Sequence, residues 1–378
     1  MLSAIVNSKL IVADQIIEGK AVIFDKMIHS IVDADQLSKD LQIIDAGGAY
    51  LSAGFIDIHI HGSGGSDVMD ATKEALNTIS ESIVQNGTTS FLATTMTMDL
   101  HSIENALDNI QSNASSVNGA NILGAHLEGP FINPLKCGAQ DKSHIIKADI
   151  SFIDRYSDIV KMITLAPEMG GSDAFITHLK KHYPHISLSI GHSNATYEEA
   201  MHALDLGIDH ATHLGNAMSA MHHRAPGVIG AVLDSNITCD VIADRIHLHD
   251  ATLRTFWRIK KEQLILITDA MRAGCMCDGS YNLGGQVVNV EKGKATLQNG
   301  QLAGSVLRLN EALRNMRDIT GVPIPQALFC VTEVPAKKLG LKKGRIKEGY
   351  DADMAIFDEN FDILLTIVDG QIKYKKGA

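Results

Sequence analysis

Residues 54–61 read Gly-Phe-Ile-Asp-Ile-His-Ile-His, a short apolar run that closes on two histidines. It is the first of eight such runs, and stretches with helical periodicity lie between them. Strands that alternate with helices are typical of a parallel sheet, and eight repeats close a (β/α)8 TIM-type barrel. The predicted strands span residues 54–60, 90–95, 122–127, 162–166, 186–190, 210–214, 238–242 and 264–268. Predicted helices include 73–85, 102–112, 197–206, 250–261 and, after a Gly-rich insertion, 307–316.

Both ends of the chain carry a different pattern. Short β-type segments at 4–6, 9–12, 20–24 and 28–32 are broken by Asn, Gly or Asp, and the pattern returns at 354–357, 363–368 and 371–374. Such segments are typical of antiparallel strands. We therefore expect an α/β chain in which residues 1–50 and 341–378 share a small β-sandwich domain, and residues 51–340 form a catalytic barrel.

Composition excludes several classes of protein. With 45% hydrophobic residues, 32 Gly and only 8 Pro, the 378-residue chain is neither disordered nor fibrous. A net charge of −11 disfavours a nucleic-acid partner. No apolar run approaches a membrane span, and the N-terminus lacks the features of a signal peptide. The five cysteines form no CxxC pair, which indicates reduced thiols and a cytoplasmic protein.

Ligand-type side chains stand at the ends of the predicted strands. The active site of a (β/α)8 barrel lies at the C-terminal ends of its strands, so these side chains are the candidates for chemistry. They are His59, His61, Glu128, Glu168, His192, His213, Asp244, nearby His247, and Asp269. His126 shares the face of Glu128 and is expected to fill the barrel rather than to bind a ligand.

A divalent metal site is the prediction from the histidines. His59 and His61 are two residues apart on one strand and point to the same face, although a pair of this kind can also be two hydrogen-bonded histidines in a turn. With Glu128, His192 and His213 at other strand ends, the set favours one or two ions of Zn, with Fe or Mn as alternatives. Glu128 has two oxygens and could bridge two ions.

Asp269 and Arg224 are the candidates for proton transfer and for phosphate binding. Asp269 follows the apolar run 264–268, where a carboxylate could accept a proton from water and return it to a leaving amine; its alternative role is a helix cap. Arg224 lies in a polar loop after the sixth strand, where it is either a surface residue or a phosphate ligand.

Cys275 and Cys277 are expected to be reduced loop thiols. No P-loop motif is present, which disfavours nucleotide hydrolysis.

The sequence resembles the amidohydrolase superfamily and, within it, the N-acetylglucosamine-6-phosphate deacetylases. The HxH pair and the final Gly-Tyr-Asp-Ala-Asp block mark the superfamily, whereas the His-Leu-Glu-Gly-Pro-Phe, His-Leu-Gly-Asn-Ala-Met and Leu-Ala-Gly-Ser blocks mark the deacetylases. The blocks lie in the family's order along essentially the whole chain, at residues 54–62, 126–131, 191–193, 212–218, 268–270, 302–305 and 344–353.

The resemblance implies roles for individual residues. It implies a metal held by Glu128, His192 and His213, a possible second ion at His59 and His61, and Asp269 as the acid and base. The sugar-binding positions of the family fall on Ala139, Gln140, Asn216, Ala217, His247, Leu302, Ala303 and Gly304. Some members have histidine at the position of Gln140. Arg224 matches an arginine that reaches the substrate phosphate of the neighbouring subunit, which implies a homodimer.

The implied activity is hydrolysis of the acetamide of N-acetylglucosamine 6-phosphate, a phosphorylated amino sugar, to glucosamine 6-phosphate and acetate in amino-sugar catabolism. Two alternatives stay open at this point. One is the same reaction on N-acetylgalactosamine 6-phosphate, which differs by one epimeric hydroxyl. The other is a catalytically inactive scaffold on the same barrel, against which an intact ligand set and Asp269 argue.

Overall fold

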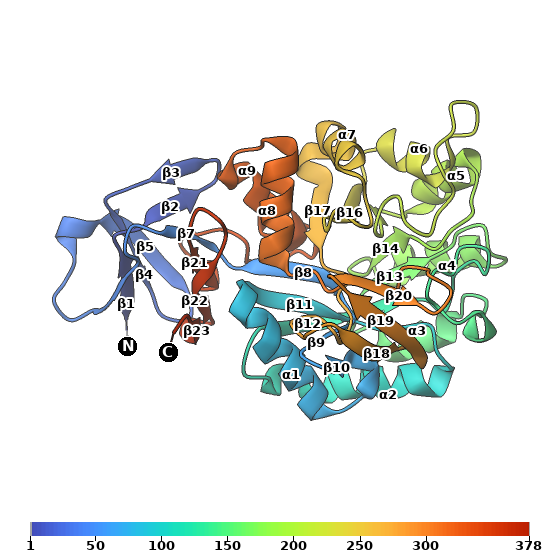
Figure 1. The fold of residues 1–378 in the computed structure, drawn as a ribbon, viewed down its shortest axis with the longest axis horizontal. Helices are drawn as coiled ribbons and strands as arrows, with labels where there is room; N and C mark the ends of the chain where they lie inside the picture. The colour runs from blue at the N-terminus through green and yellow to red at the C-terminus, as the bar shows by residue number, and fades with distance from the viewer. Residues whose placement is uncertain (1, 378) are drawn as a thin grey trace.

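Eight parallel strands form the body of the computed structural model, which describes residues 2–377 (Figure 1). In sheet order these strands are β8 (Phe55–Ile60), β11 (Thr88–Thr94), β12 (Asn121–Glu128), β13 (Val160–Leu165), β14 (Ser187–Ile190), β15 (His210–Ala211), β16 (Thr238–Ile242) and β17 (Leu264–Ile267). The N–H of Asp269 donates to the carbonyl of His59 at 2.9 Å and joins the last strand to the first. The predicted (β/α)8 barrel is confirmed.

Burial on both faces explains why these runs become strands. Every residue of β8, β11, β14 and β17 is buried, as expected for a parallel sheet covered by helices. The covering helices are α1 (Lys73–Ile83), α2 (Leu100–Asn113), α3 (Ile150–Tyr156), α4 (Ser172–His182), α5 (Tyr197–Leu206), α6 (Gly227–Leu233), α7 (Asp250–Lys260) and α8 (Leu309–Thr320). Two shorter helices, α9 (Ile324–Phe329) and α10 (Glu333–Lys338), follow α8.

Local signals fix where these helices begin and end. Thr196 and Glu199 form a capping box at the start of α5. Helix α8 buries Leu309, Leu313 and Met316 at helical spacing and ends at Thr320; Gly321 follows it with φ +72°. A left-handed glycine is the usual residue after a helix C-terminus.

The two chain ends pack together as a β-sandwich (Figure 1). One sheet holds β5 (Ile28–Asp33), β4 (Lys20–Phe24), β1 (Ser3–Val6) and β6 (Gln42–Asp45); the other holds β23 (Gln371–Lys375), β22 (Ile363–Val368), β21 (Met354–Phe357), β7 (Tyr50–Ala53), β2 (Lys9–Val12) and β3 (Gln15–Ile17). Side chains of both sheets share one apolar core, which includes Ile5, Phe24, Leu51 and Ile356. The predicted sandwich is confirmed, whereas β3, β6 and β7 were missed. The domain boundaries at 50 and 340 stay predictions.

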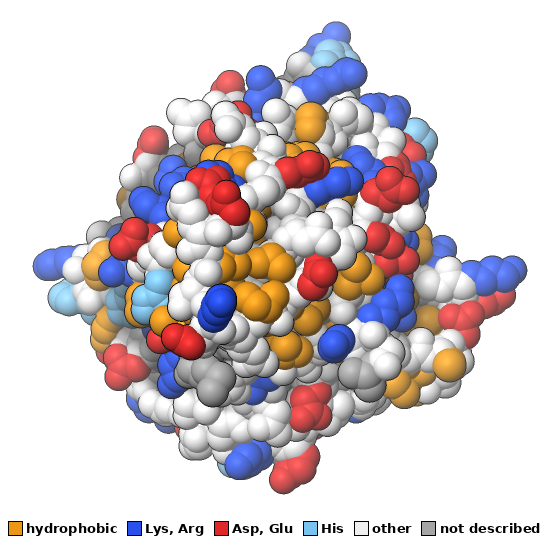
Figure 2. Space-filling view, turned by 90° about the vertical axis from the view of Figure 1, so that its left-hand side faces the viewer, with side chains coloured by type: hydrophobic (Ala, Val, Ile, Leu, Met, Phe, Trp, Pro, Cys, Tyr) orange, Lys and Arg blue, Asp and Glu red, His pale blue; other side chains and the backbone are white. Residues whose placement is uncertain are grey.

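The face formed by the terminal sheets is turned toward the viewer in Figure 2. Apolar side chains gather near its centre, and acidic and basic side chains are mixed around them. None of the helices in residues 2–377 combines the length and apolar character that crossing a bilayer requires.

The Gly-rich insertion is the main departure from the predicted architecture. It forms a three-stranded antiparallel sheet of β18 (Gly279–Leu283), β19 (Gln286–Glu291) and β20 (Lys294–Leu297). Leu283 and Val288 of this sheet pack on Met96 and Met271 beside the barrel strands. The amide nitrogen of Gln286 donates to the carbonyl of Ala139 at 2.6 Å. The insertion is therefore part of the wall around the C-terminal end of the barrel; β9 (Gly62–Ser63) and β10 (Ser66–Asp67) form a small hairpin next to it.

Candidate active site

Three of the candidate residues lie just beyond the ends of their strands in a strained backbone conformation. His192, His213 and Asp269 follow β14, β15 and β17 with φ values of +49°, +34° and +47°. Positive φ is uncommon for residues other than glycine, and it concentrates at functional sites. At these points the chain leaves the strand sharply and turns each side chain into the end of the barrel.

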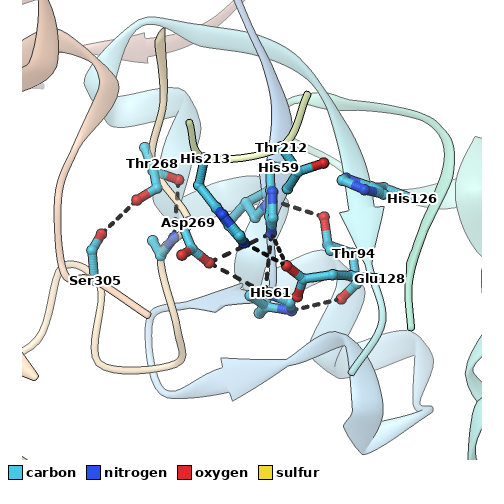
Figure 3. Close-up of polar contacts among 12 residues, drawn as sticks. His59, His61, Thr94, His126, Glu128, Thr212, His213, Thr268, Asp269 and Ser305 are labelled. Carbon is cyan, nitrogen blue, oxygen red and sulfur yellow. Dashed lines mark hydrogen bonds and ion pairs between the residues drawn. The ribbon is translucent and has the colours of Figure 1, made fainter. Parts of the chain in front are cut away.

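Two adjacent groups of ligand-type side chains result. His59, His61 and Asp269 form one group, and Glu128, His192 and His213 form the other. All six residues are buried. The imidazoles and carboxylates of His59, His61, His213, Glu128 and Asp269 point toward one common centre (Figure 3). The structure thus brings together all six residues that the sequence nominated as metal ligands or as the catalytic acid and base.

Glu128 lies between the two groups. Its Oε1 is 3.1 Å from Nε2 of both His192 and His213, and its Oε2 is 3.2 Å from Nε2 of His61. Oδ1 of Asp269 is 3.3 Å from the same nitrogen of His61 and 3.5 Å from Nε2 of His59. Oε1 of Glu128 is also 3.4 Å from Nε2 of His59. The carboxylate therefore contacts both groups, and Oε2 is the oxygen nearest to His61.

The donor atoms fit a divalent cation. Nδ1 of His192 lies 2.9 Å from the carbonyl of Lys136, and Nδ1 of His61 lies 3.3 Å from the carbonyl of Thr94. A carbonyl only accepts, so each Nδ1 carries the proton and a neutral ring leaves a lone pair on Nε2. The Nε2 atoms of His192 and His213 are 3.1 Å apart, close to the ~3.3 Å between ligand atoms that lie about 2.0–2.1 Å from a tetrahedral Zn²⁺.

The charges of the site are strongly coupled. Burial opposes ionisation of Glu128, but the histidines His59 and His192 outweigh it and hold the pKa of Glu128 well below its ordinary value. For Asp269, His59 and His61 likewise outweigh burial and lower its pKa to about 2. Both carboxylates are therefore ionised at neutral pH, as ligand or base chemistry requires.

A second layer of hydrogen bonds holds these side chains. Gln140 donates from Nε2 to Oε2 of Glu128 at 2.7 Å, and its own Oε1 accepts from the N–H of Thr97 at 2.6 Å. Nδ1 of His247 pairs with Oδ2 of Asp244 at 2.7 Å. Such partners fix ring tautomers and carboxylate orientation. Sequence reasoning did not find the contact of Thr97 with Gln140, because it joins residues from separate loops.

His126 and Glu168 lie outside the cluster. His126 is fully buried and contacts the carbonyl of Ile58 at 3.1 Å and the hydroxyl of Thr164 at 2.7 Å. Its ring packs edge-on against that of His59, with the ring centroids 4.7 Å apart, while both of its nitrogens are directed to these other partners (Figure 3). Burial lowers its pKa well below the ordinary value. Glu168 accepts hydrogen bonds from Asn133 and Ser193. Both residues therefore support the barrel. This was expected for His126, whereas Glu168 was a ligand-type candidate from its position at a strand end and lies outside both ligand groups.

A cavity of about 370 Å³ opens above the cluster. Twelve residues that were predicted to bind metal or sugar or to act in catalysis line it: His61, Glu128, Ala139, Gln140, His192, His213, Asn216, Ala217, His247, Asp269, Leu302 and Gly304. Ala303 is fully buried and packs behind the wall instead. Lining residues that the sequence reasoning missed are Met96, Leu135, Lys136, Gly138, Leu283 and Gln301. Lys136 and Gly138 lie in the same loop as Gln140. Their closeness in sequence to this predicted sugar-binding residue could have identified them as cavity residues.

A model of the amidohydrolase family matches residues 50–373. The chain belongs to the amidohydrolase family. The match extends over the whole barrel and over β21, β22 and most of β23. It therefore covers both candidate ligand groups.

Curated relatives of this amidohydrolase match nearly its full length. An N-acetylglucosamine-6-phosphate deacetylase from Lysinibacillus sphaericus is 41% identical over 364 residues, which is 94% of this chain and 92% of that protein. An N-acetylgalactosamine-6-phosphate deacetylase from Escherichia coli O157:H7 is 34% identical over 330 residues, 85% of this chain and 87% of that protein.

Solved structures agree with this fold. The N-acetylglucosamine-6-phosphate deacetylase of Pasteurella multocida superposes with a TM-score of 0.94 at 32% identity, covering 98% of this chain and 99% of that one. An aspartate-to-alanine variant of the Mycobacterium smegmatis enzyme, in complex with N-acetyl-D-glucosamine-6-phosphate, gives a TM-score of 0.92 at 25% identity and covers 99% of this chain and all of that one.

Arg224 does not reach the cavity of its own amidohydrolase chain. It is exposed in a tight turn in which His222 and Ala225 pair, and its backbone N–H contacts Nδ1 of His222. The segment between β15 and α6 that carries this turn projects beyond α5 and α6 (Figure 1). Cys275 and Cys277 are free thiols in a loop, as predicted.

Proposed function

We propose that this amidohydrolase removes the acetyl group of N-acetylglucosamine 6-phosphate to give glucosamine 6-phosphate and acetate, as a step of amino-sugar catabolism in the cytoplasm. The observation that carries the proposal is the pair of buried ligand groups at the floor of a 370 Å³ cavity. The activities of relatives that match nearly the full chain support the choice of substrate.

The proposal includes a divalent metal ion held by Glu128, His192 and His213, with His59 and His61 available to a second ion. The all-nitrogen and oxygen donor set supports Zn, with Fe or Mn as alternatives. A bound divalent ion would supply Lewis-acid chemistry, which polarises an amide carbonyl and lowers the pKa of water toward neutrality.

In the proposed mechanism the chain's own residues move the protons and hold the substrate. Asp269 accepts the proton of the attacking water and then donates it to the amine, which cannot leave as an anion. His247, fixed by Asp244 through Nδ1, presents its Nε2 side to the cavity and orients the sugar or the developing oxyanion. Ala139, Gln140, Asn216 and Ala217, together with Leu302 and Gly304, position the sugar ring.

The proposal places the phosphate group against Arg224 of a second subunit. Arg224 is exposed and lies outside its own cavity, and guanidinium binds phosphate oxygens in a bidentate way. A homodimer in which each subunit supplies this arginine to the other would complete both sites.

An acetate-release assay with both epimers tests the proposal. We expect kcat/KM for N-acetylglucosamine 6-phosphate to exceed that for N-acetylgalactosamine 6-phosphate, the rival substrate. The reverse order would replace the proposed substrate with its epimer. Absence of acetate release from either sugar by metal-loaded protein would favour an inactive scaffold.

A further inference from the structure

Gln140 is fixed at both ends of its amide. Its Oε1 accepts from the N–H of Thr97 at 2.6 Å, and its Nε2 donates to Oε2 of Glu128 at 2.7 Å. A backbone N–H can only donate and an ionised carboxylate can only accept, so the amide has one possible orientation. The side chain is 6% exposed. Gln140 thus places a permanent hydrogen-bond donor against one oxygen of Glu128.

The two oxygens of Glu128 are not equivalent because of this contact. Oε1, which lies 3.1 Å from Nε2 of His192 and His213 and 3.4 Å from Nε2 of His59, is the oxygen that Gln140 does not bind. Oε2, which faces His61, already shares a lone pair with Gln140. A carboxylate oxygen that accepts a hydrogen bond gives less electron density to a cation. The site of His59, His61 and Asp269 would draw on Oε2 through its side next to His61, so it is weakened more than the other site.

The same contact also limits rotation of the carboxylate. The hydrogen bond from Gln140 to Oε2 opposes a rotation that would turn both oxygens of Glu128 toward His192 and His213. Glu128 would therefore offer an ion at that site one oxygen and stay in place between the two groups.

We propose that Gln140 makes the two metal sites unequal, so that one ion binds tightly at Glu128, His192 and His213 and a second binds weakly at His59, His61 and Asp269. This inference rests on the metal-binding part of the proposed function. It adds that Gln140 determines whether a second ion is bound beside the first. A weak second site has a chemical consequence, because Asp269 then stays available as the proton acceptor rather than being held as a ligand.

Metal titration of the full-length protein tests this inference without any substrate. The apo protein is titrated with Zn²⁺ in the presence of a chromophoric chelator, and the two dissociation constants are fitted. For the parent protein we expect the second constant to be at least tenfold larger than the first. Gln140→Met keeps the length of the side chain and removes the donor, so the ratio of the two constants should fall about tenfold, which is about 1.4 kcal/mol.

One control variant and one alternative variant complete the test. Gln301→Met changes another glutamine of the same cavity, which makes no hydrogen bond to Glu128 among residues 2–377, and should leave the ratio unchanged. Gln140→Leu serves as a second variant if thermal unfolding shows that Gln140→Met is misfolded. Removal of a residue that merely orients Glu128 would weaken both sites together, as other outer hydrogen-bond partners do.

The outcomes separate this inference from the proposed function. An unchanged ratio in both folded Gln140 variants, or a parent protein with two equal sites, overturns the inference. Absence of any tight Zn²⁺ binding by the parent protein overturns the metal site itself. Unequal sites in a protein that releases no acetate would leave the inference standing and remove the proposed reaction.

Discussion

The hydroxyl of Thr268 donates a 2.6 Å hydrogen bond to Oδ2 of Asp57 across the seam between β17 and β8. Oδ1 of Asp57 accepts from the N–H of His59 at 3.2 Å. Burial raises the pKa of Asp57 to about 7, against the opposing effect of these hydrogen bonds. Asp57 therefore ties the strand of His59 to the residue that precedes Asp269, and the contact fixes two members of the same ligand group relative to each other.

Thr268→Val should lower the free energy of unfolding by about 1–3 kcal/mol, because it leaves an oxygen of a buried carboxylate without its donor. It should also lower kcat, since Asp269 follows directly. Urea denaturation and acetate release measure both effects. Thr366→Val is the matched control: Thr366 is equally buried, but its hydroxyl has no partner among residues 2–377. Equal losses for the two variants would contradict a specific role for the seam contact.

Asp269→Asn should preserve the fold and a bound ion at Glu128, His192 and His213 while abolishing turnover. The amide is nearly isosteric with the carboxylate, but it cannot accept the proton of water. The checks are acetate release together with elemental analysis. A near-normal rate in a metal-loaded variant would remove Asp269 from the mechanism.

Replacement of the ligands should affect metal content unequally. Glu128→Ala removes the carboxylate that contacts both groups, so it should lose bound metal and activity together. His59→Ala should lose at most a second ion, because His59 belongs only to the other group. Elemental analysis after gel filtration distinguishes the two variants, and unchanged metal in Glu128→Ala would refute the assignment.

Arg224→Ala should raise KM steeply for the phosphorylated sugar and leave slow turnover of unphosphorylated N-acetylglucosamine nearly unchanged. The guanidinium meets only the phosphate in the proposed complex.

Mixing Arg224→Ala with Asp269→Asn subunits tests where the arginine acts. A heterodimer would hold one complete site, with Asp269 of one subunit and Arg224 of the other, so activity at low substrate should exceed that of either parent. No increase after confirmed subunit exchange would place Arg224 in its own subunit's site or outside any site.

Asp209 provides a prediction away from the cavity. Although burial opposes its ionisation, Lys338 and Lys180 lower the pKa of Asp209 to about 2, with both ammonium groups at 2.7 Å. A depressed folded-state pKa contributes stability above the unfolded value of about 3.9, and this contribution is lost as pH falls toward 2.

Asp209→Asn should therefore destabilise the protein at pH 7, by no more than about 1 kcal/mol because the side chain is 42% exposed. The difference from the parent should shrink as pH falls from about 4 toward 2 and vanish only below pH 2, and KM should not change. Thermal unfolding over a pH series, with the exposed turn variant Asp14→Asn as control, measures this. A constant difference at every pH would exclude the ion pairs as its cause.

Much of the fold was predictable because local signals and the tertiary structure agree. Helix α5 and strand β16 begin and end at the predicted residues, Tyr197–Leu206 and Thr238–Ile242. Strand β15 is shorter than predicted, since the backbone of His213 turns to positive φ. The insertion was missed as a sheet because β18 and β19 are half exposed and lack a long apolar run.

The candidate site was predictable in its ligand-type residues but not in its supporting contacts. Strand-end position singles out Glu128, His192 and His213, since the barrel brings strand ends together. The contacts of Gln140 with Thr97 and Glu128 depend on how three separate segments meet, and no spacing within the chain encodes that. The same reason explains why Ala303 was expected in the wall of the cavity and instead packs behind it.

The sandwich made from both chain ends has a consequence for biosynthesis. Strand β7 pairs with β2 on one edge and with β21 on the other, and roughly 300 residues separate Ala53 from Met354. At a translation rate of about 5–20 residues per second, the second edge of β7 waits about 15–60 s for its partner. During that time a nascent chain carries an open β-edge beside a folding barrel, so β21 protects this edge against aggregation only after the whole barrel has been synthesised.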